Sequence, residues 1–331
     1  MDMSDAGSPG AGGADRGHLS TERRNPASAA LDAMSTEQVL AVMNGQDIDV
    51  PRVVRAAIVP LARLTDDLVE RMQAGGRLVY VGAGTSGQLG VFDASGFEAA
   101  PGEVVALIAG GDAALRTGSG AHAEDAEGSR GELLRLGLGE ADMLVGLSAG
   151  GTTPYVWGAL GFAHDRGAAT GLITCVTASG LKARRRLPTV PGRESVGQMP
   201  SASLPVAVDH VVELAVGPEV IAGATRLKAG TAMKLALNMI STAVMVRCGR
   251  TWGNLMVDFA MTSDKLRDRA LRILSEQAGL DAQAGGALLE QAEGRLKVAL
   301  VMAKLNVGVA EAESRLAEHG GRLRPLLGGP R

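Results

Sequence analysis

Cysteine is scarce in this chain of 331 residues, which contains only Cys175 and Cys248. Two cysteines are too few for the disulfide framework of a small secreted domain, and their spacing gives no CxxC metal site. We predict that Cys175 lies in a strand and Cys248 at a helix end. This usage fits a reducing cytosol, so the sequence predicts a cytoplasmic protein without a bound metal. Aromatic residues are also few, and Trp157 and Trp252 are interpreted as core or interface residues.

Neither an excess of basic charge nor a long hydrophobic run is present. The formal net charge is −3, and no basic patch is dense enough to indicate a nucleic-acid partner. The longest apolar stretches, near LALNMISTAVMV, are shorter than the roughly 20 residues of a membrane span. No membrane partner is therefore expected. Residues 1–20 are rich in small residues and have no apolar core, which predicts a disordered tail and not a signal peptide.

Short apolar runs alternate with helix-sized segments along the middle of the chain. The runs are RLVYV, VVALIAGG, DMLVGLSAGG, ATGLITCVTAS and HVVELAVG. Continuous apolar runs are typical of strands buried on both faces, so the alternation predicts an α/β fold with a doubly wound parallel sheet. Ligands of such sheets bind beyond the carboxyl ends of the strands, which makes the loops at those ends the candidate site.

Helical patterns flank the predicted sheet. A helix start is expected at Ser35, residues 50–73 carry one apolar stripe, and residues 225–250 are predicted to form a long core helix. Glycine-punctuated amphipathic segments indicate a small helical domain near the end of the chain. The predicted organisation is an α/β domain over 21–262 with N-terminal helices, an exposed insertion loop over 178–204, and a C-terminal helical domain over 263–331.

Two strand-end loops combine glycines with hydroxyl side chains. The first, GAGTSG, has the GxGxxG spacing of dinucleotide sites, but Asp112 comes too late to be the acidic residue of that motif. Backbone N–H groups and hydroxyls at a helix start suit a single phosphate monoester better. Tight turns with hydroxyl caps are the alternative. The candidate phosphate-binding residues are Gly84, Thr85, Ser86 and Gly87 in the first loop and Ser148, Gly150, Thr152 and Thr153 in the second.

Longer motifs extend the argument to most of the chain. Across residues 21–324, the segments TERRNPAS, GGRLVYVGAGTSGQLGVFDAS, LIAGGDAALR, GPEVIAGATRLKAGTAMKLALNMIST and GNLMVDFAMTSDKL resemble those of the bacterial N-acetylmuramic acid 6-phosphate etherases. The resemblance implies a sugar isomerase (SIS) fold, of flavodoxin-like type and akin to the sugar-binding modules of glucokinase regulatory protein. It also implies a homodimer with sites near the subunit interface. The implied reaction uses no cofactor and cleaves the D-lactyl ether of a phosphorylated amino sugar by elimination and rehydration.

The resemblance implies two catalytic carboxylates, because neither a C–H proton nor an alkoxide leaves readily at neutral pH. Glu124 in HAEDAE matches one of them and is expected in a dry pocket. Gly96 stands where the family has the other, and Glu98 is the candidate to replace it. In the second loop, Gly150 and Thr152 stand where the family has serine and arginine, and Ser148 is the candidate replacement hydroxyl.

Glu219, Thr225 and Lys228, in GPEV and the segment after it, are further candidate substrate-binding residues. Glu219 is a candidate for proton transfer on an open-chain sugar, although a carboxylate that caps a helix or pairs with Arg226 explains it equally well. His122 is a weaker acid–base candidate beside Glu124. Two alternatives to the etherase reaction stay open: a sugar-phosphate sensor without turnover, and an aldose–ketose isomerase that uses Glu219.

Overall fold

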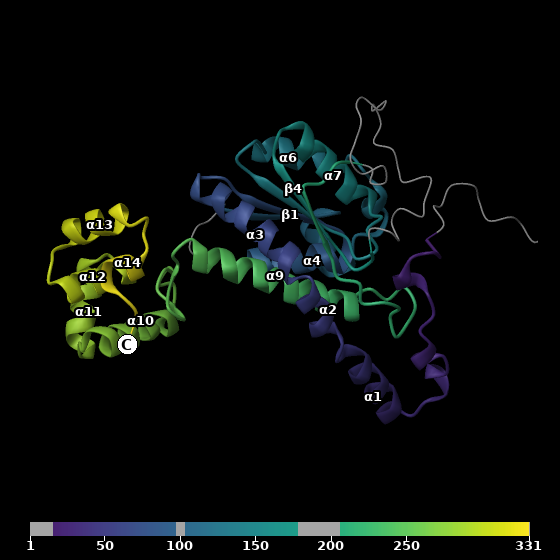
Figure 1. Ribbon diagram of the computed structural model, residues 1–331, viewed down its shortest axis with the longest axis horizontal. Coiled ribbons are helices and arrows are strands. Elements are labelled where there is room, and N and C mark those ends of the chain that lie inside the picture. Colours follow the sequence, from purple (N-terminus) through teal and green to yellow (C-terminus); the bar gives the residue numbers. More distant parts are fainter. Residues whose placement is uncertain (1–15, 97–102, 178–205, 331) are drawn as a thin grey trace, which may run out of the picture.

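The computed structural model describes residues 16–96, 103–177 and 206–330 (Figure 1). A five-stranded parallel sheet in the order β2-β1-β3-β4-β5 forms the centre of the fold. This confirms the predicted α/β class. From β1 the chain adds β2 on one side and β3, β4 and β5 on the other, so the strand order reverses between β1 and β3. Doubly wound folds bind ligands at this point of the sheet. The strands are β1 (Leu78–Gly82), β2 (Val104–Ile108), β3 (Met143–Leu147), β4 (Ala169–Thr174) and β5 (His210–Glu213).

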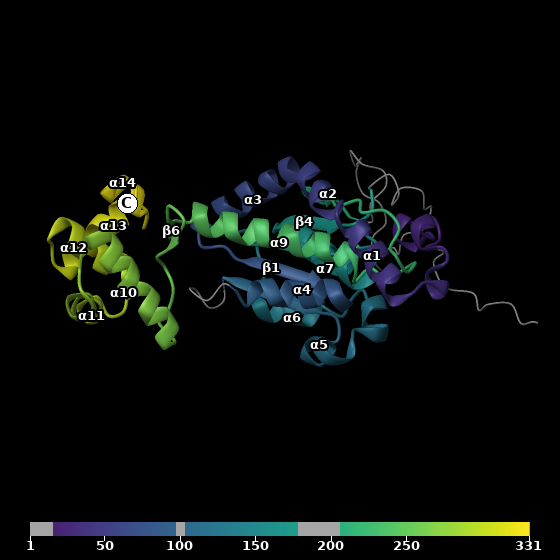
Figure 2. The same ribbon diagram turned by 90° about the horizontal axis from the view of Figure 1, so that it is seen from below.

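The apolar runs are continuous because alternate residues of each strand enter different cores. Leu78 and Tyr80 of β1 pack on one face of the sheet, while Val79 and Val81 pack on the other. Helices α3 and α9 run side by side on the first face, with α4 next to α9 (Figure 2). Helices α6 and α7 cover the second face. Their bounds are α3 (Ile58–Gln73), α4 (Gly84–Ala94), α6 (Arg130–Leu136), α7 (Pro154–Asp165) and α9 (Lys228–Arg247).

The N-terminal helices differ in part from their prediction. Helix α1 (Thr36–Asp47) starts with a capping box between Ser35 and Gln38, as expected. The predicted single helix over 50–73 is wrong, because the chain breaks at Ala57 between α2 (Val50–Ala56) and α3. Short helices fill the remaining connections: η1 (Ser20–Glu22), η2 (Pro26–Ser28), η3 (Leu31–Ala33), η4 (Gly111–Ala113), α5 (Ala114–Thr117) and η5 (Gly120–Glu124).

Helix α9 is the predicted long core helix. By length and composition alone it would also pass for a membrane-spanning helix. Its buried residues, which include Met233, Leu237 and Ile240, instead belong to the main core, and the helix packs against α2, α3 and α4. The apolar character of α9 is therefore explained by burial inside the protein.

The C-terminal helices have a hydrophobic core of their own and lie beyond the end of α9 (Figure 1). Trp252, Val257 and Phe259 pack in this core, so it takes in residues that precede the predicted boundary at 263. Both tryptophans are buried core residues. The elements are the hairpin β6 (Thr251–Trp252) and β7 (Leu255–Met256), followed by α10 (Asp264–Ala278), α11 (Ala282–Gln291), α12 (Leu296–Leu305), α13 (Val309–Glu318) and α14 (Leu323–Leu327).

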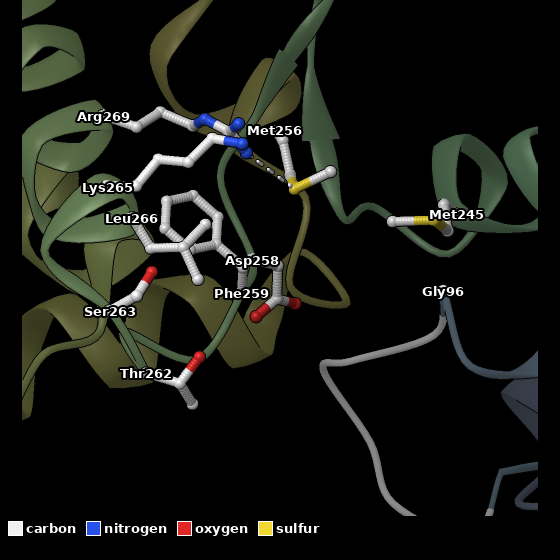
Figure 3. Close-up of a pocket in the computed structure, with 10 residues that line it drawn as sticks. All are labelled: Gly96, Met245, Met256, Asp258, Phe259, Thr262, Ser263, Lys265, Leu266 and Arg269. Atoms are coloured by element: carbon white, nitrogen blue, oxygen red, sulfur yellow. Dashed lines mark hydrogen bonds between the residues drawn. The ribbon is translucent and has the colours of Figure 1, made fainter.

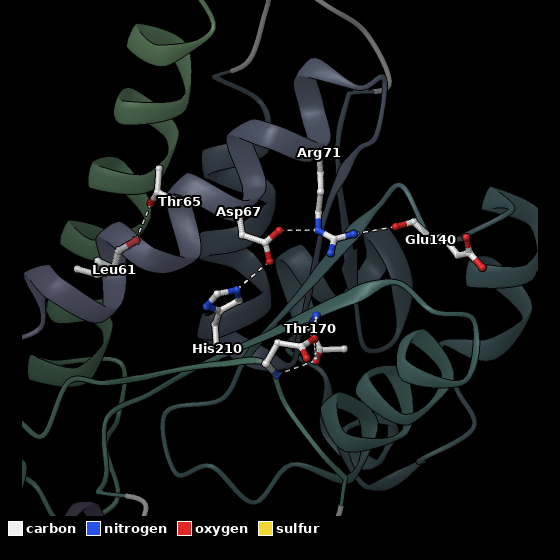
Figure 4. A network of polar contacts seen from close by, with 8 residues as sticks. Leu61, Thr65, Asp67, Arg71, Glu140, Thr170 and His210 are labelled. Carbon is white, nitrogen blue, oxygen red and sulfur yellow. Dashed lines mark hydrogen bonds and ion pairs between the residues drawn. The ribbon is translucent and has the colours of Figure 1, made fainter.

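A polar network fixes α3 to β5 at the edge of the sheet where the strands begin (Figure 4). Asp67 accepts hydrogen bonds from Arg71 Nε at 2.8 Å and contacts His210 Nε2 at 2.9 Å. Arg71 also donates to the Glu140 carbonyl at 2.7 Å. Burial acts to raise the pKa of Asp67, but the hydrogen bonds from His210 and Arg71 outweigh it and lower the pKa.

Candidate functional site

The first candidate loop is shaped by two glycines that pack backbone against backbone. A Cβ atom at Gly82 would lie 2.7 Å from the Gly87 nitrogen, and one at Gly87 would lie 2.8 Å from the Gly82 oxygen. Larger residues at these positions would push α4 away from β1. Gly84 has a φ of +54°, which favours glycine. The GxGxxG spacing thus serves close helix–strand packing, and it places Thr85 and Ser86 in the first turn of α4.

The second candidate loop follows β3 and is fixed by hydrogen bonds of buried side chains. The Ser148 hydroxyl is buried and lies 2.8 Å from the Thr153 hydroxyl. Trp157 Nε1 donates a 2.9 Å hydrogen bond to the Gly151 carbonyl, which fixes the turn against α7. Thr152 is also buried. In this chain the loop therefore presents backbone and partly covered hydroxyls at the edge of the sheet where β1 also ends.

Glu219 has a structural role at the start of α9. Its two carboxylate oxygens accept the backbone N–H groups of Lys228 at 3.0 Å and Ala229 at 2.9 Å. This confirms the capping alternative, since these are orphan donors of a helix N-terminus. Burial raises the pKa of Glu219, and the two backbone hydrogen bonds only partly oppose the rise. The start of α9 adjoins the first loop, because a Cβ atom at Gly230 would lie 3.7 Å from Thr85 Cγ2.

Lys228 is buried and bonds to the N-terminal part of the chain. Its Nζ donates to Gln46 Oε1 at 3.3 Å, and it lines a cavity of about 220 Å³ together with Gln46, Asp49 and Pro218. Thr225 contributes its carbonyl, which accepts the Gly230 N–H at 2.9 Å. These contacts place both residues in the support of α9, and their role in substrate binding stays a prediction.

Glu124 lies at the same edge of the sheet as the two loops. It is the last residue of η5, and Ser119, the residue before η5 begins, accepts a 2.7 Å hydrogen bond from the Gly84 N–H at the start of α4. The Glu124 side chain is 57% exposed and forms an ion pair with Arg16. The sequence prediction of a dry pocket is therefore wrong for this carboxylate in the single chain. His122 is exposed and packs against Gly110.

Position 96 lies at the other end of α4. Gly96 follows the last turn of this 11-residue helix, about 16 Å from its first turn at 1.5 Å per residue. There it borders a cavity of about 320 Å³ whose lining includes Asp258, Lys265 and Arg269 (Figure 3). Glu98 lies outside the described residues. The two positions that match the family carboxylates, 96 and 124, are thus at opposite ends of α4 in one chain.

Sequence reasoning missed two groups of residues at these sites. Lys265 and Arg269 line the cavity beside position 96, and the segment GNLMVDFAMTSDKL in the resemblance was the available signal. The second group is the segment 16–25, which we call the N-terminal strap. Part of it was predicted to be a disordered tail, but Leu19 is only 1% exposed and belongs to the fold; residues 1–15 lie outside the described residues. The insertion loop predicted over 178–204 also lies outside them.

The strap crosses the edge of the sheet that carries the candidate loops. Leu19 packs with Val176, and its Cδ1 atom would lie 3.7 Å from a Cβ atom at Gly150. The Thr21 carbonyl accepts the Gly223 N–H at 2.9 Å. Together with the ion pair to Glu124, these contacts join the strap to the chain after β2, β3, β4 and β5. Among the residues that the structure describes, no group of three His, Cys, Asp or Glu side chains is arranged to hold a metal ion.

Comparison with known proteins gives one consistent answer. Residues 60–164 match the glucokinase regulatory protein N-terminal SIS domain family. The N-acetylmuramic acid 6-phosphate etherase of Rubrobacter xylanophilus is 44% identical over 316 residues, which cover 94% of this chain and 97% of the relative. That of Pectobacterium atrosepticum is 43% identical over 319 residues, covering 95% and 97%.

Among solved structures, a phosphoheptose isomerase from Francisella tularensis superposes with a TM-score of 0.45 at 17% identity, covering 64% of this chain and 98% of that one. The etherase relatives, in contrast, match at more than 40% identity over nearly the full length of both partners. On that evidence the chain belongs to the N-acetylmuramic acid 6-phosphate etherase family.

Proposed function

We propose that the protein is a carbon–oxygen lyase that converts N-acetylmuramic acid 6-phosphate and water into N-acetylglucosamine 6-phosphate and D-lactate. The observation that carries the proposal is the placement of the two hydroxyl loops and Glu124 at one edge of the sheet. Family membership supports the same reaction, because the relatives carry the name of this activity.

Each part of the proposed site has a chemical task. The first turn of α4, with Thr85 and Ser86, offers backbone N–H groups and hydroxyls to the phosphate. The second loop adds Thr152 and Thr153 from the facing strand end. The sugar opens to its aldehyde, a carboxylate removes the acidified C2 proton, and the lactyl oxygen takes a proton from the resulting carboxylic acid as lactate leaves C3. Water then adds across the double bond to give the product. We assign proton transfer to Glu124.

A homodimer is part of this proposal. Positions 96 and 124, which match the two carboxylate positions of the family, lie at opposite ends of α4 in one chain, so only a second copy would bring the two positions to one sugar. An apolar groove of about 820 Å³ between α3 and α9 offers a contact face, on which Ile58, Met239 and Val246 are each a little less than half exposed. Both cysteines are free thiols, which fits the cytoplasmic location that we propose.

The test is lactate release from N-acetylmuramic acid 6-phosphate. We expect turnover by the wild type and a loss of at least 100-fold in Glu124→Gln, the size typical for removal of an acid–base group. Glu127→Gln is the matched control, because Glu127 is an exposed carboxylate three residues further on with its own partner, Arg130. No lactate from the wild type, or equal rates in all three proteins, would refute the assignment.

Gly96 favours a second candidate function, a sugar-phosphate sensor without turnover, because this position offers no carboxylate. Calorimetry with hexose 6-phosphates and 6-phospho-aminosugars separates the two: tight binding without lactate release supports the sensor. The isomerase alternative is weaker, since both Glu219 oxygens are already occupied by backbone N–H groups.

A further inference from the structure

The N-terminal strap contacts the segments that follow β2, β3, β4 and β5, but it adds no strand to the sheet. Leu19 anchors its middle, being 1% exposed and packed against Val176. Asn25 anchors its end, because its Nδ2 donates to Gln46 Oε1 at 2.7 Å and to the Pro218 carbonyl at 3.2 Å. The strap is thus fixed at its middle and at its end, and its first residue, Arg16, contacts Glu124.

We propose that Arg16 is a positioning residue for Glu124 and that the strap is a wall of the active site. This inference rests on the proposed function. Arg16 Nη2 lies 2.9 Å from Glu124 Oε1 and 3.3 Å from Oε2, so one donor contacts both carboxylate oxygens. The two residues are 108 positions apart in the chain. An exposed glutamate otherwise samples several rotamers, and a guanidinium that contacts both oxygens selects one of them.

The exposure of the pair indicates that its main effect is not on folding. The side chains are 40% and 57% exposed, and ion pairs at such positions contribute little to stability. A catalytic carboxylate, in contrast, has to be held within about 0.5 Å of its working position. The contact therefore has more to contribute to catalysis than to the fold.

Unpaired polar atoms in the strap support the same conclusion. Arg16 Nε, His18 Nε2 and Thr21 Oγ1 are buried without a hydrogen-bond partner among the residues that the structure describes. Buried polar groups are nearly always paired, and an unpaired one needs an explanation such as a catalytic role or a bound water. A segment retained only to cover the sheet would be expected to place apolar side chains at these three positions.

The experiment measures lactate release by the full-length chain with Arg16 changed. In Arg16→Ala and Arg16→Met we expect kcat to fall on the order of 10- to 100-fold, the loss typical of a misplaced catalytic group. The KM should change less than about twofold, because the phosphate loops are untouched. Arg16→Lys should recover part of the activity. Arg315→Ala is the control and should match the wild type, because Arg315 forms a similarly exposed ion pair with Glu311 on α13, outside the strap.

A double-mutant cycle separates positioning from an indirect effect. In the Glu124→Gln background, Arg16→Ala should cause no further loss, since the carboxylate that it orients is gone. Equal kcat in the wild type and Arg16→Ala overturns the inference while the proposed function stands. A further loss in the double variant as large as in the single one also overturns it. A wild type that releases no lactate overturns the proposed function and this inference together.

Discussion

The cap of α9 gives the sharpest stability prediction. Replacing Glu219 with alanine removes the acceptor of two backbone N–H groups at 3.0 and 2.9 Å and leaves both donors buried. An unsatisfied buried donor costs about 1–3 kcal/mol, so we expect a loss of about 3 kcal/mol in the free energy of unfolding. At about 2–4 °C per kcal/mol for chains of 150–250 residues, the Tm should fall by about 6–12 °C. Glu219→Gln keeps one oxygen acceptor and should lose about half as much.

Calorimetry and urea unfolding at pH 7 measure this loss, with Glu276→Ala as an exposed control. Burial raises the pKa of Glu219 above its ordinary 4.5. The protonation-dependent part of its contribution, as distinct from the two accepted hydrogen bonds, is therefore fully present below about pH 4.5 and decreases as the pH rises through the folded-state pKa. Glu219→Gln should remove that decrease. A Glu219→Ala protein with the Tm of the wild type would refute the assignment of this carboxylate to the helix start.

Two further predictions concern the frame of the site. Burial acts to raise the pKa of Asp142, but hydrogen bonds from Arg77 outweigh it and lower the pKa. The contribution of Asp142 to the free energy of unfolding is therefore present above its ordinary pKa of 3.8 and is lost as the pH falls through the folded-state pKa. In urea unfolding from pH 5 to 2, Asp142→Asn should reduce this loss of stability at low pH. Gly87→Ala places a Cβ atom 2.8 Å from a carbonyl of β1 and should lower the free energy of unfolding by about 1–3 kcal/mol through overpacking. Calorimetry should also show a weaker affinity for hexose 6-phosphates. An unchanged Cm in urea unfolding and an unchanged affinity would contradict the close packing.

Patterns in the sequence predicted those features of the fold that are set by residues close to one another in the chain. The apolar runs predicted the parallel sheet, and the serine before TEQ predicted the start of α1. The break between α2 and α3 also had a local signal that the apolar stripe concealed. Pro60 has no N–H and its ring clashes with the carbonyl four residues earlier, at Ala56, which is where α2 ends. The apolar stripe predicted one continuous helix and Pro60 predicted a break, and the structure has the break because of the steric clash.

The arrangement of the site depends on contacts that no local pattern encodes. The pairing of Arg16 with Glu124 spans 108 residues, and the strap offers no periodicity that marks it as part of the site. The resemblance implied that position 96 and Glu124 belong to one catalytic site. An intervening helix carries position 96 to the opposite edge of the sheet. Position 96 is close to the glycine motif in sequence but is separated from it in space by the length of α4.

The anchoring of the strap has a consequence for biosynthesis. Asn25 and Ser28 bond to Pro218 and Val220, which follow 193 and 192 residues later. At about 5–20 residues per second, the ribosome needs roughly 10 to 40 s to make the intervening chain. During that time the earliest residues wait without their partners, so a pause or truncation before residue 220 would leave the amino-terminal segment unattached even where the first strands have already formed.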